Sequence, residues 1–297
     1  IQKWGLTDYV GAVTDGTYGA VGLDFKSPHT GLAAKKVWFF FDKTYVCLGT
    51  DISSRMKNQV LTTVNQCLLN GQVTVSDADG IHPQERGSRM KKGVRWVVHD
   101  RVGYYFLNKE NVILSNQRTE GSWKIANRQT TTPTDIIQQD VFTLSVDHGS
   151  YPNNEGYAYM VVPSADPLSI EKQVEEEGVV VLANCPDVQA VRHDGLNMAY
   201  AVFYKGGTLR IHDKIVVEMD APGMLMVKYN DAGEILTLGV SDPTRFMKKL
   251  HLSVNQRIVG TAQENIQTEW DGKQALTRIS VDLPQNEYAG KSVIYNK

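Results

Sequence analysis

Residues 35–51 read KKVWFFFDKTYVCLGTD, and this stretch decides the fold class. Two runs of large apolar residues flank Asp42-Lys43, a pattern that predicts a β-hairpin with its turn at this polar pair. A strand that is apolar at consecutive positions is covered on both of its faces. We therefore expect residues 38–41 to lie in a central strand of a sheet that packs against a second sheet, with Phe40 in the core.

Short strand-like segments recur along the rest of the chain and are separated by turn residues. In TLRIHD, at 208–213, apolar and polar residues alternate as in a strand with one buried face. A strand is also expected at 123–126. Helical periodicity is confined to SIEKQVEEEG, at 169–178, where a glycine ends a short helix. Many short strands with few helices predict an all-β protein built from sandwiches.

A domain boundary is expected near the segment VVPSADPLSIEKQVEEEG, at 161–178. Two prolines and four glutamates lie here between apolar strands, as is typical of a linker followed by one short helix. A chain of 297 residues is long enough for two domains. The predicted division is 1–168 and 169–297, each half being rich in strands.

Composition excludes several classes of partner. The net charge is −2, so no basic surplus indicates nucleic acid binding. No apolar run approaches the roughly 20 residues of a membrane-spanning helix, so no membrane partner is expected. The chain begins at Ile1 with no signal-peptide pattern, and we expect it to be a mature product or a piece of a longer protein.

Cysteine and histidine patterns point to no catalytic or metal centre. The three cysteines show no metal-type spacing. Cys47 and Cys67 lie in apolar runs and are expected to be buried thiols, and a disulfide between them stays open. The seven histidines are scattered, and no nucleophile elbow, P-loop or dinucleotide fingerprint is present. DADG, at 77–80, resembles the start of a calcium loop but lacks its closing glutamate. The basic segment 86–95 is either a contact for an acidic polymer or a solvated loop.

Longer motifs, in order along the chain, resemble the β-region of polysaccharide lyase family 8. They are YVGAVTDGTYGAVGLDFKSPHTGLAAKKVWFFFDKTYVCLGTDISS at 9–54, WVVHDRVGYYF at 96–106, DVFTLSVDHG at 140–149 and GYAYMVVP at 156–163. VLANCPDVQAV and MAYAVFY, in the second half, resemble the C-terminal sandwich of the same family. The family includes chondroitin AC, hyaluronate and xanthan lyases, and the resemblance is greatest to the chondroitin AC lyases.

The resemblance implies a large antiparallel supersandwich domain of galactose-mutarotase-like fold, with its first strands missing, followed by a smaller C-terminal antiparallel β-sandwich. It implies that the family's catalytic Asn, His, Tyr and Arg lie on an N-terminal α/α toroid outside this chain. No catalytic residue is therefore assigned here. The expected partners are that toroid and an acidic polysaccharide of chondroitin or hyaluronan type, and the expected location is extracellular or periplasmic.

The function implied is the β-sheet portion of a secreted glycosaminoglycan or uronate-polysaccharide lyase, which supports substrate binding and the toroid. The alternative is a stand-alone carbohydrate-binding or structural β-sandwich protein. For carbohydrate binding, aromatic side chains that could stack on sugar rings are Trp96, Tyr104, Tyr105 and Trp123.

The resemblance also implies a structural calcium ion near TDGTYGAVGLDF. The matching carboxylates are Asp15 and Asp24, with backbone oxygens of Thr17 and Phe25 as companions. Hard oxygen ligands of this kind suit calcium. Two alternatives stay open. Asp15 can belong to a plain hairpin turn with Asp24 at a strand end. Otherwise, a lysine can pair with either carboxylate: Lys26, Lys35 or Lys36.

Overall fold

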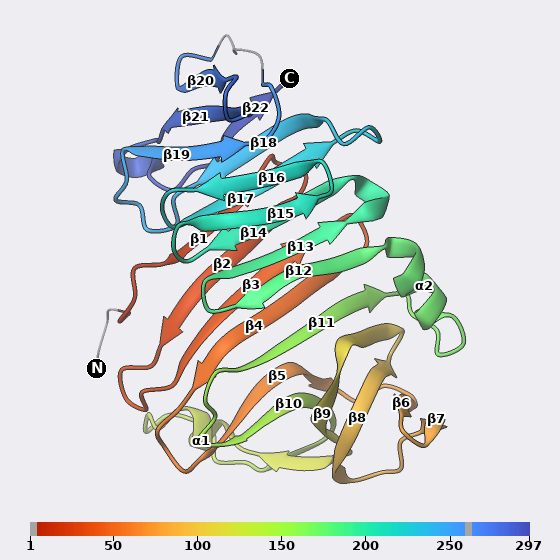
Figure 1. Ribbon diagram of the computed structural model, residues 1–297. Helices are drawn as coiled ribbons and strands as arrows, with labels where there is room; N and C mark the ends of the chain where they lie inside the picture. The colour runs from red at the N-terminus through yellow and green to blue at the C-terminus, as the bar shows by residue number, and fades with distance from the viewer. Residues whose placement is uncertain (1–4, 259–262) are drawn as a thin grey trace. The chain divides into compact units, whose positions relative to one another are not determined.

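The computed structural model describes residues 5–258 and 263–297 (Figure 1). The described strand pairs are antiparallel, and helix is confined in these ranges to short segments. This confirms the predicted all-β class. The chain forms two compact units, called unit 1 and unit 2: unit 1 is Ile1–Met56, Tyr151–Ala158 and Glu171–Lys297, and unit 2 is Lys57–Ser150 and Tyr159–Ile170. The predicted boundary between 168 and 169 stays a prediction.

Unit 1 begins with an antiparallel meander of four strands. These are β1 (Val10–Thr14), β2 (Gly19–Lys26), β3 (Ala33–Phe40) and β4 (Tyr45–Ser53), with the start of β11 (Glu155–Pro163) beside β4. The backbone N–H of Phe41 donates to the carbonyl of Thr44 at 3.0 Å and closes the β3–β4 turn. The hairpin predicted around Asp42-Lys43 is therefore confirmed.

The expectation that β3 is covered on both faces, with Phe40 in the core, is wrong. The Phe39 side chain is fully buried, whereas Phe40 is 42% exposed. Successive side chains of a strand point to opposite faces. Phe39 faces Tyr200 of β14 (Met198–Phe203), with ring centroids 6.0 Å apart, and Phe40 lies against Tyr45 on the other face. Although the run of aromatic residues is unbroken, buried and exposed side chains alternate along it, as in a strand with one buried face.

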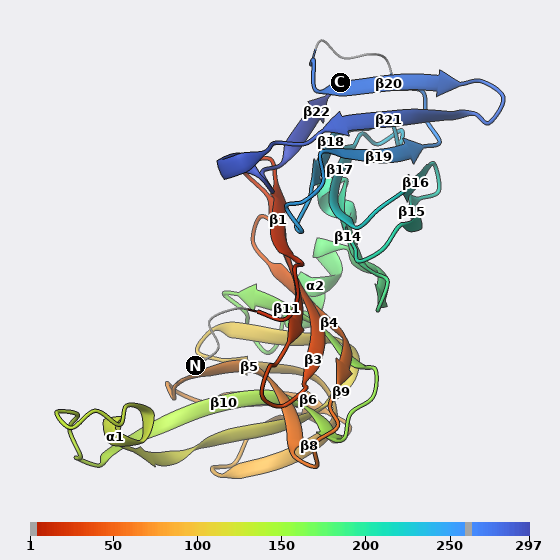
Figure 2. The ribbon, with the colours of Figure 1, turned by 90° about the vertical axis from the view of Figure 1, so that its left-hand side faces the viewer.

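The rest of unit 1 is a two-layer sandwich (Figure 2). The six-stranded sheet has the order β12-β13-β14-β17-β18-β22, and the five-stranded sheet has the order β15-β16-β19-β21-β20. Apolar side chains from both sheets form one buried cluster, which confirms the predicted C-terminal sandwich. The bounds are β12 (Val179–Cys185), β13 (Val188–His193), β15 (Gly207–His212), β16 (Ile215–Met219), β17 (Gly223–Tyr229), β18 (Ile235–Ser241), β19 (Lys249–Val254), β20 (Ile266–Asp271), β21 (Leu276–Asp282) and β22 (Val293–Asn296), with 3-10 turns at Asp194–Leu196 and Asn286–Tyr288.

Unit 2 is built around the long strand β9 (Val102–Gly121), which pairs with β8, β10 and the second half of β11. Its other elements are β5 (Gln59–Leu68), β6 (Val73–Asp77), β7 (Gly80–Pro83), β8 (Ser88–His99), α1 (Trp123–Ala126) and β10 (Ile137–Ser150). Most of the basic segment 86–95 is thus strand β8, so the solvated-loop alternative is wrong for it. Trp96 and Tyr104 are buried, whereas Trp123 is exposed.

The two helices bear out one prediction and correct another. Helix α2 (Ile170–Glu177) lies where predicted and ends at Gly178, whose φ of 61° suits glycine. Residues 123–126, expected as a strand, form the single turn α1. The Ser122 side chain accepts a hydrogen bond from the backbone N–H of Lys124 at 3.2 Å, so a helix-capping signal outweighs the apolar pattern.

Cys47, Cys67 and Cys185 are free thiols, so the disulfide left open between the first two does not form. Cys47 is buried, as expected, whereas Cys67 is only partly buried, so the expectation of a buried thiol is wrong for Cys67. Within the described part of the chain, no helix has the length and apolar character needed to cross a membrane.

Candidate functional site

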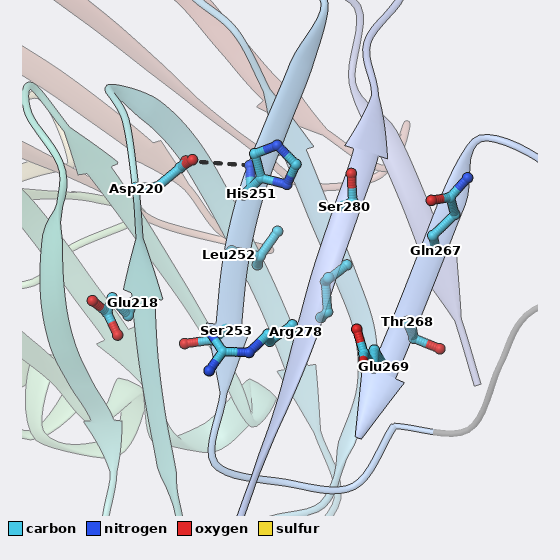
Figure 3. Close-up of a pocket in the computed structure, with 11 residues that line it drawn as sticks. Glu218, Asp220, His251, Leu252, Ser253, Gln267, Thr268, Glu269, Arg278 and Ser280 are labelled. Atoms are coloured by element: carbon cyan, nitrogen blue, oxygen red, sulfur yellow. Dashed lines mark hydrogen bonds between the residues drawn. The ribbon is translucent and has the colours of Figure 1, made fainter. Parts of the chain in front are cut away.

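The five-stranded sheet of unit 1 carries a polar groove of about 620 Å³ on its outer face (Figure 3). The groove arises because alternate residues of each strand point away from the sandwich core. Leu252 and Ile279, for example, are mostly buried, while their neighbours Ser253 and Arg278 face outward. The lining residues are Glu218, Asp220, His251, Leu252, Ser253, Gln267, Thr268, Glu269, Arg278, Ile279 and Ser280.

Strand register arranges one row of polar side chains across this face. Glu218 lies opposite Ser253, Ser253 opposite Arg278, and Arg278 opposite Glu269. Adjacent strands are about 4.8 Å apart, so four strands spread these groups over roughly 15 Å. The row offers a hydroxyl, a guanidinium and two carboxylates to a ligand that lies across the strands.

A second row runs beside the first. His251 lies opposite Ser280, and Ser280 lies opposite Gln267. At the end of this row, the backbone N–H of His251 donates to the Asp220 carboxylate at 3.2 Å, as the dashed line in Figure 3 marks. This row offers an imidazole, a hydroxyl and an amide. Such groups can donate and accept hydrogen bonds to the hydroxyls of a polyhydroxylated ligand.

The charge of the groove decides which ligands it accepts. Three carboxylates face one guanidinium, that of Arg278, which is itself held by Asp271 at 3.4 Å and by Gln274 at 2.6 Å. Because these carboxylates outnumber the guanidinium, the groove is net negative, so it repels a polyanion and suits a neutral ligand. Among residues 5–258 and 263–297, no group of three His, Cys, Asp or Glu side chains could hold a metal ion. The charge of the groove therefore does not favour an acidic polysaccharide.

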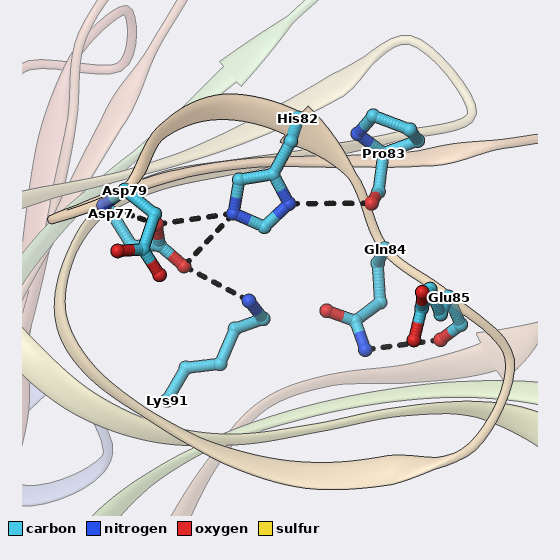
Figure 4. Close-up of polar contacts among 7 residues, drawn as sticks. All are labelled: Asp77, Asp79, His82, Pro83, Gln84, Glu85 and Lys91. Atoms are coloured by element: carbon cyan, nitrogen blue, oxygen red, sulfur yellow. Dashed lines mark hydrogen bonds and ion pairs between the residues drawn. The ribbon is translucent and has the colours of Figure 1, made fainter.

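A second polar cluster, in unit 2, surrounds Asp77 at the β6–β7 turn (Figure 4). The Lys91 ammonium lies 2.9 Å from Oδ2 of Asp77, and Nε2 of His82 lies 3.1 Å from both carboxylate oxygens. The backbone N–H of Asp79 donates to Oδ1 at 3.0 Å, and Gly80 takes a φ of 102°. The DADG segment is thus a tight turn whose first carboxylate is held by two basic side chains.

These contacts determine how Asp77 titrates. Burial alone would raise the pKa of Asp77, but hydrogen bonds from Lys91, His82 and the Asp79 N–H together outweigh burial and lower this pKa. The ionised carboxylate is therefore favoured in the folded chain. Its stabilising effect is present above the ordinary aspartate pKa of about 3.9 and is lost as the pH falls through the lower folded value.

We expect Asp77→Asn to lower the free energy of unfolding at pH 7 by about 1–3 kcal/mol, because charge-assisted hydrogen bonds are lost. Urea unfolding of both proteins between pH 7 and pH 3 measures the effect. The difference between wild type and variant should be fully present at about pH 5 and shrink below about pH 4. A difference that grows as the pH falls from about 4 to 3 would contradict the assigned direction of the pKa shift. Asp79→Asn is the matched control.

The structure does not bring Asp15 and Asp24 together. In the β1–β2 register, Thr14 pairs with Gly19 and Val10 with Leu23, so Asp15 lies in the turn and Asp24 at the far end of the hairpin. Six strand positions correspond to roughly 20 Å. The expectation that the hairpin folds these carboxylates around one ion is wrong, because they lie at its opposite ends. Of the expected companions, Thr17 lies in the Asp15 turn, and Phe25 lies beside Asp24.

Asp15 is satisfied by neighbours in unit 1. Its carboxylate accepts backbone hydrogen bonds from Thr17 at 3.0 Å and Tyr18 at 2.9 Å, and it pairs with the Lys228 ammonium of β17. Burial alone would raise the pKa of Asp15, yet these hydrogen bonds lower it. A lysine does pair with Asp15, but it is Lys228 and none of the three expected lysines; the sequence gives no local signal for this pair because the two residues lie 213 positions apart.

Asp24 has a different environment. Burial raises its pKa, and the charge of Lys35, its β3 neighbour in register, offsets this only partly. The Lys35 ammonium is bound elsewhere, at 3.2 Å from Asp51 and 2.8 Å from the carbonyl of Pro186. The structural calcium ion stays a prediction, and the contacts of Asp15 and Asp24 lend it no support.

Comparisons with known proteins place these domains in a family. The description "Polysaccharide lyase family 8, super-sandwich domain" matches residues 1–174, and "Polysaccharide lyase family 8, C-terminal beta-sandwich domain" matches residues 180–251. Chondroitinase-AC from Pedobacter heparinus is 36% identical over 97% of this chain and 38% of its own length. A hyaluronate lyase from Thermasporomyces composti is 29% identical over 95% of this chain and 36% of its own length.

The fold agrees with these matches. A solved chondroitinase AC lyase superposes with a TM-score of 0.82 and 35% identity, covering 97% of this chain and 40% of that chain. The chain thus spans about two fifths or less of these relatives. Because the super-sandwich match covers more than half of the sequence and the sandwich match follows it, the chain belongs to polysaccharide lyase family 8.

Proposed function

We propose that this chain is the β-sheet portion of a secreted glycosaminoglycan or uronate-polysaccharide lyase. In this proposal it supports substrate binding and a catalytic α/α toroid that lies outside the chain. The observation that carries the proposal is that two consecutive β-domains of the family match, while the chain spans only 38% of Chondroitinase-AC. A secreted lyase would act outside the cell or in the periplasm.

The chemistry of elimination also supports a catalytic site that lies on the toroid and not on these β-domains. Breaking the polysaccharide by β-elimination removes the C5 proton beside the uronate carboxylate and needs a base, an acid and a group that neutralises the carboxylate. The groove on the five-stranded sheet holds one histidine and no tyrosine. Burial raises the pKa of Tyr200 and Tyr204, so neither readily becomes a phenolate. The side chains described above therefore do not supply the base, the acid and the carboxylate-neutralising group that elimination needs, and we assign them a structural role.

Two histidines are held by local contacts inside the protein. Nε2 of His193 lies 2.8 Å from the Glu177 carboxylate, and the ring packs on Phe41 with centroids 4.7 Å apart. Nε2 of His148 lies 2.9 Å from the Thr62 hydroxyl. Both residues are at least nine-tenths buried, so they fix local structure and are remote from a dissolved polymer.

The isolated chain should show no lyase activity. Elimination creates an unsaturated uronate that absorbs ultraviolet light, so product release from chondroitin or hyaluronan is followed directly by absorbance. We expect the purified chain to match a buffer control, while the parent polypeptide that carries the upstream toroid forms product. Product formation by the purified chain above the control would reject the proposal.

A further inference from the structure

A second hollow lies in unit 1, where three stretches of chain meet at the end of the β2-β3-β4 meander. It measures about 570 Å³ and is lined by the β2–β3 loop, by the residues that follow β4, and by the loop before β11. Two hydrogen bonds tie these stretches together. The backbone N–H of Ser54 donates to the carbonyl of Pro152 at 2.9 Å, and that of Asn154 donates to the Ser53 hydroxyl at 3.0 Å.

Arg55 is the charged residue among those that line this hollow. Its side chain is exposed and makes no hydrogen bond or ion pair with a described residue, in contrast to Arg278 of the groove. A guanidinium presents a planar fork of N–H donors that matches a carboxylate or a sulfate with two parallel hydrogen bonds. The hollow is therefore net positive and attracts anionic ligands, which the groove on the five-stranded sheet repels.

Tyr151 supplies an aromatic face beside this cation. Its side chain is 55% exposed although its backbone is fixed, with a φ of 53° that residues other than glycine adopt uncommonly. The Ser54–Pro152 hydrogen bond holds the loop in this conformation. A large ring held at the surface by a strained, hydrogen-bonded loop is pre-organised for contact, because little conformational freedom is lost on binding.

The hydroxyls of the hollow retain hydrogen-bonding capacity. The Ser53 hydroxyl accepts from Asn154, and the Ser54 hydroxyl accepts from the backbone N–H of Met56 at 3.2 Å. Each hydroxyl therefore keeps its own proton to donate. The Asn153 side chain also lines the hollow. Donors and acceptors of this kind, next to a cation and an aromatic ring, match an acidic sugar.

We propose that this Arg55–Tyr151 hollow binds one anionic sugar of an acidic polysaccharide. The guanidinium of Arg55 holds the carboxylate or sulfate, the Tyr151 ring packs on the sugar ring, and Ser53, Ser54 and Asn153 hydrogen-bond to its hydroxyls. The inference rests on the proposed function and deepens it, since it gives the supporting β-domains a substrate contact of their own. It does not depend on catalysis.

Calorimetric titration of the full chain tests the inference with three tetrasaccharides. Hyaluronan carries carboxylates alone, chondroitin 4-sulfate carries carboxylates and sulfates, and chitotetraose is neutral. We expect binding of the first two, weakening as NaCl is raised from 50 to 500 mM, and no binding of chitotetraose. Tighter binding of the sulfated ligand would assign Arg55 to the sulfate, and equal binding would assign it to the carboxylate.

The variants separate binding from folding. Arg55→Ala should weaken binding by about tenfold or more, because a charge-assisted hydrogen-bond pair is lost. Tyr151→Gly should weaken binding several-fold while keeping or raising the melting temperature, because glycine adopts the positive φ without strain. Arg257→Ala is the matched control, an exposed arginine away from this hollow, and should leave binding unchanged.

Binding that Arg55→Ala and Tyr151→Gly leave unchanged would overturn the hollow as the site, and so would a wild-type chain that ignores both acidic tetrasaccharides at millimolar concentration. Either result would leave the proposed function standing, because that function is judged by product formation. Conversely, lyase activity of the isolated chain would reject the proposed function without altering these binding constants.

Discussion

Replacing Phe39 with alanine should lower the free energy of unfolding by about 3–5 kcal/mol, as for a large-to-small change in a close-packed core. The Phe39 side chain is fully buried in β3, between Ala20 of β2 and Val46 of β4 in register. Its ring lies 6.0 Å from that of Tyr200. Removal leaves a cavity that a packed sheet cannot close. Urea unfolding followed by tryptophan fluorescence measures the loss.

Phe40→Ala is the control for this experiment, because it removes the same side chain one position along the strand. Phe40 is 42% exposed, so its truncation should cost less than about 1 kcal/mol. A cost for Phe40→Ala equal to that for Phe39→Ala would show that β3 is covered on both faces, which is the expectation drawn from the sequence alone.

Gly49→Ala should be the second strongly destabilising substitution. A Cβ atom at residue 49 would lie 2.1 Å from Cε1 and 2.5 Å from Cζ of Tyr157, far inside van der Waals contact. Tyr157 is itself only 3% exposed, so its ring has no free space to move into. Overpacking of this kind costs about 1–3 kcal/mol or more. Thermal and urea unfolding of the variant measure the loss.

Two further variants make the Gly49 test specific. Gly207→Ala is the matched control, since a Cβ atom there has nothing within 4 Å and should change stability little. Adding Tyr157→Leu to Gly49→Ala should relieve the clash, so the double variant should lose less stability than the sum of the two single changes. Strict additivity would mean that the ring and the glycine do not compete for the same space.

Local sequence signals predicted the parts of the fold that depend on neighbouring residues. The polar pair Asp42-Lys43 between apolar runs marked the β3–β4 turn, and Gly178 marked the end of α2. Alternation and turn spacing indicated the all-β class. Each of these features depends on residues that are close together in the sequence, so the sequence alone is enough to predict it.

Features that depend on the phase of a strand or on distant residues were not predictable. Four aromatic residues in a row give no clue to which of them face the core, so the sequence predicts a strand covered on both faces, whereas Phe39 is buried and Phe40 is exposed. The pairing of Asp15 with Lys228 joins residues far apart in the chain. The Arg55–Tyr151 hollow likewise forms only when loops from three strand pairs meet. Only folding creates these contacts, since no local pattern encodes them.

The central claim is that these β-domains support catalysis that is carried out elsewhere. Its most direct test is reconstitution: the segment encoded directly upstream is produced alone, mixed with increasing amounts of this chain, and assayed for unsaturated uronate by ultraviolet absorbance. We expect the upstream segment alone to be weakly active, the chain alone to be inactive, and product formation to rise to saturation as the chain is added. Full parent activity from the upstream segment alone, unchanged by the added chain, would contradict the claim.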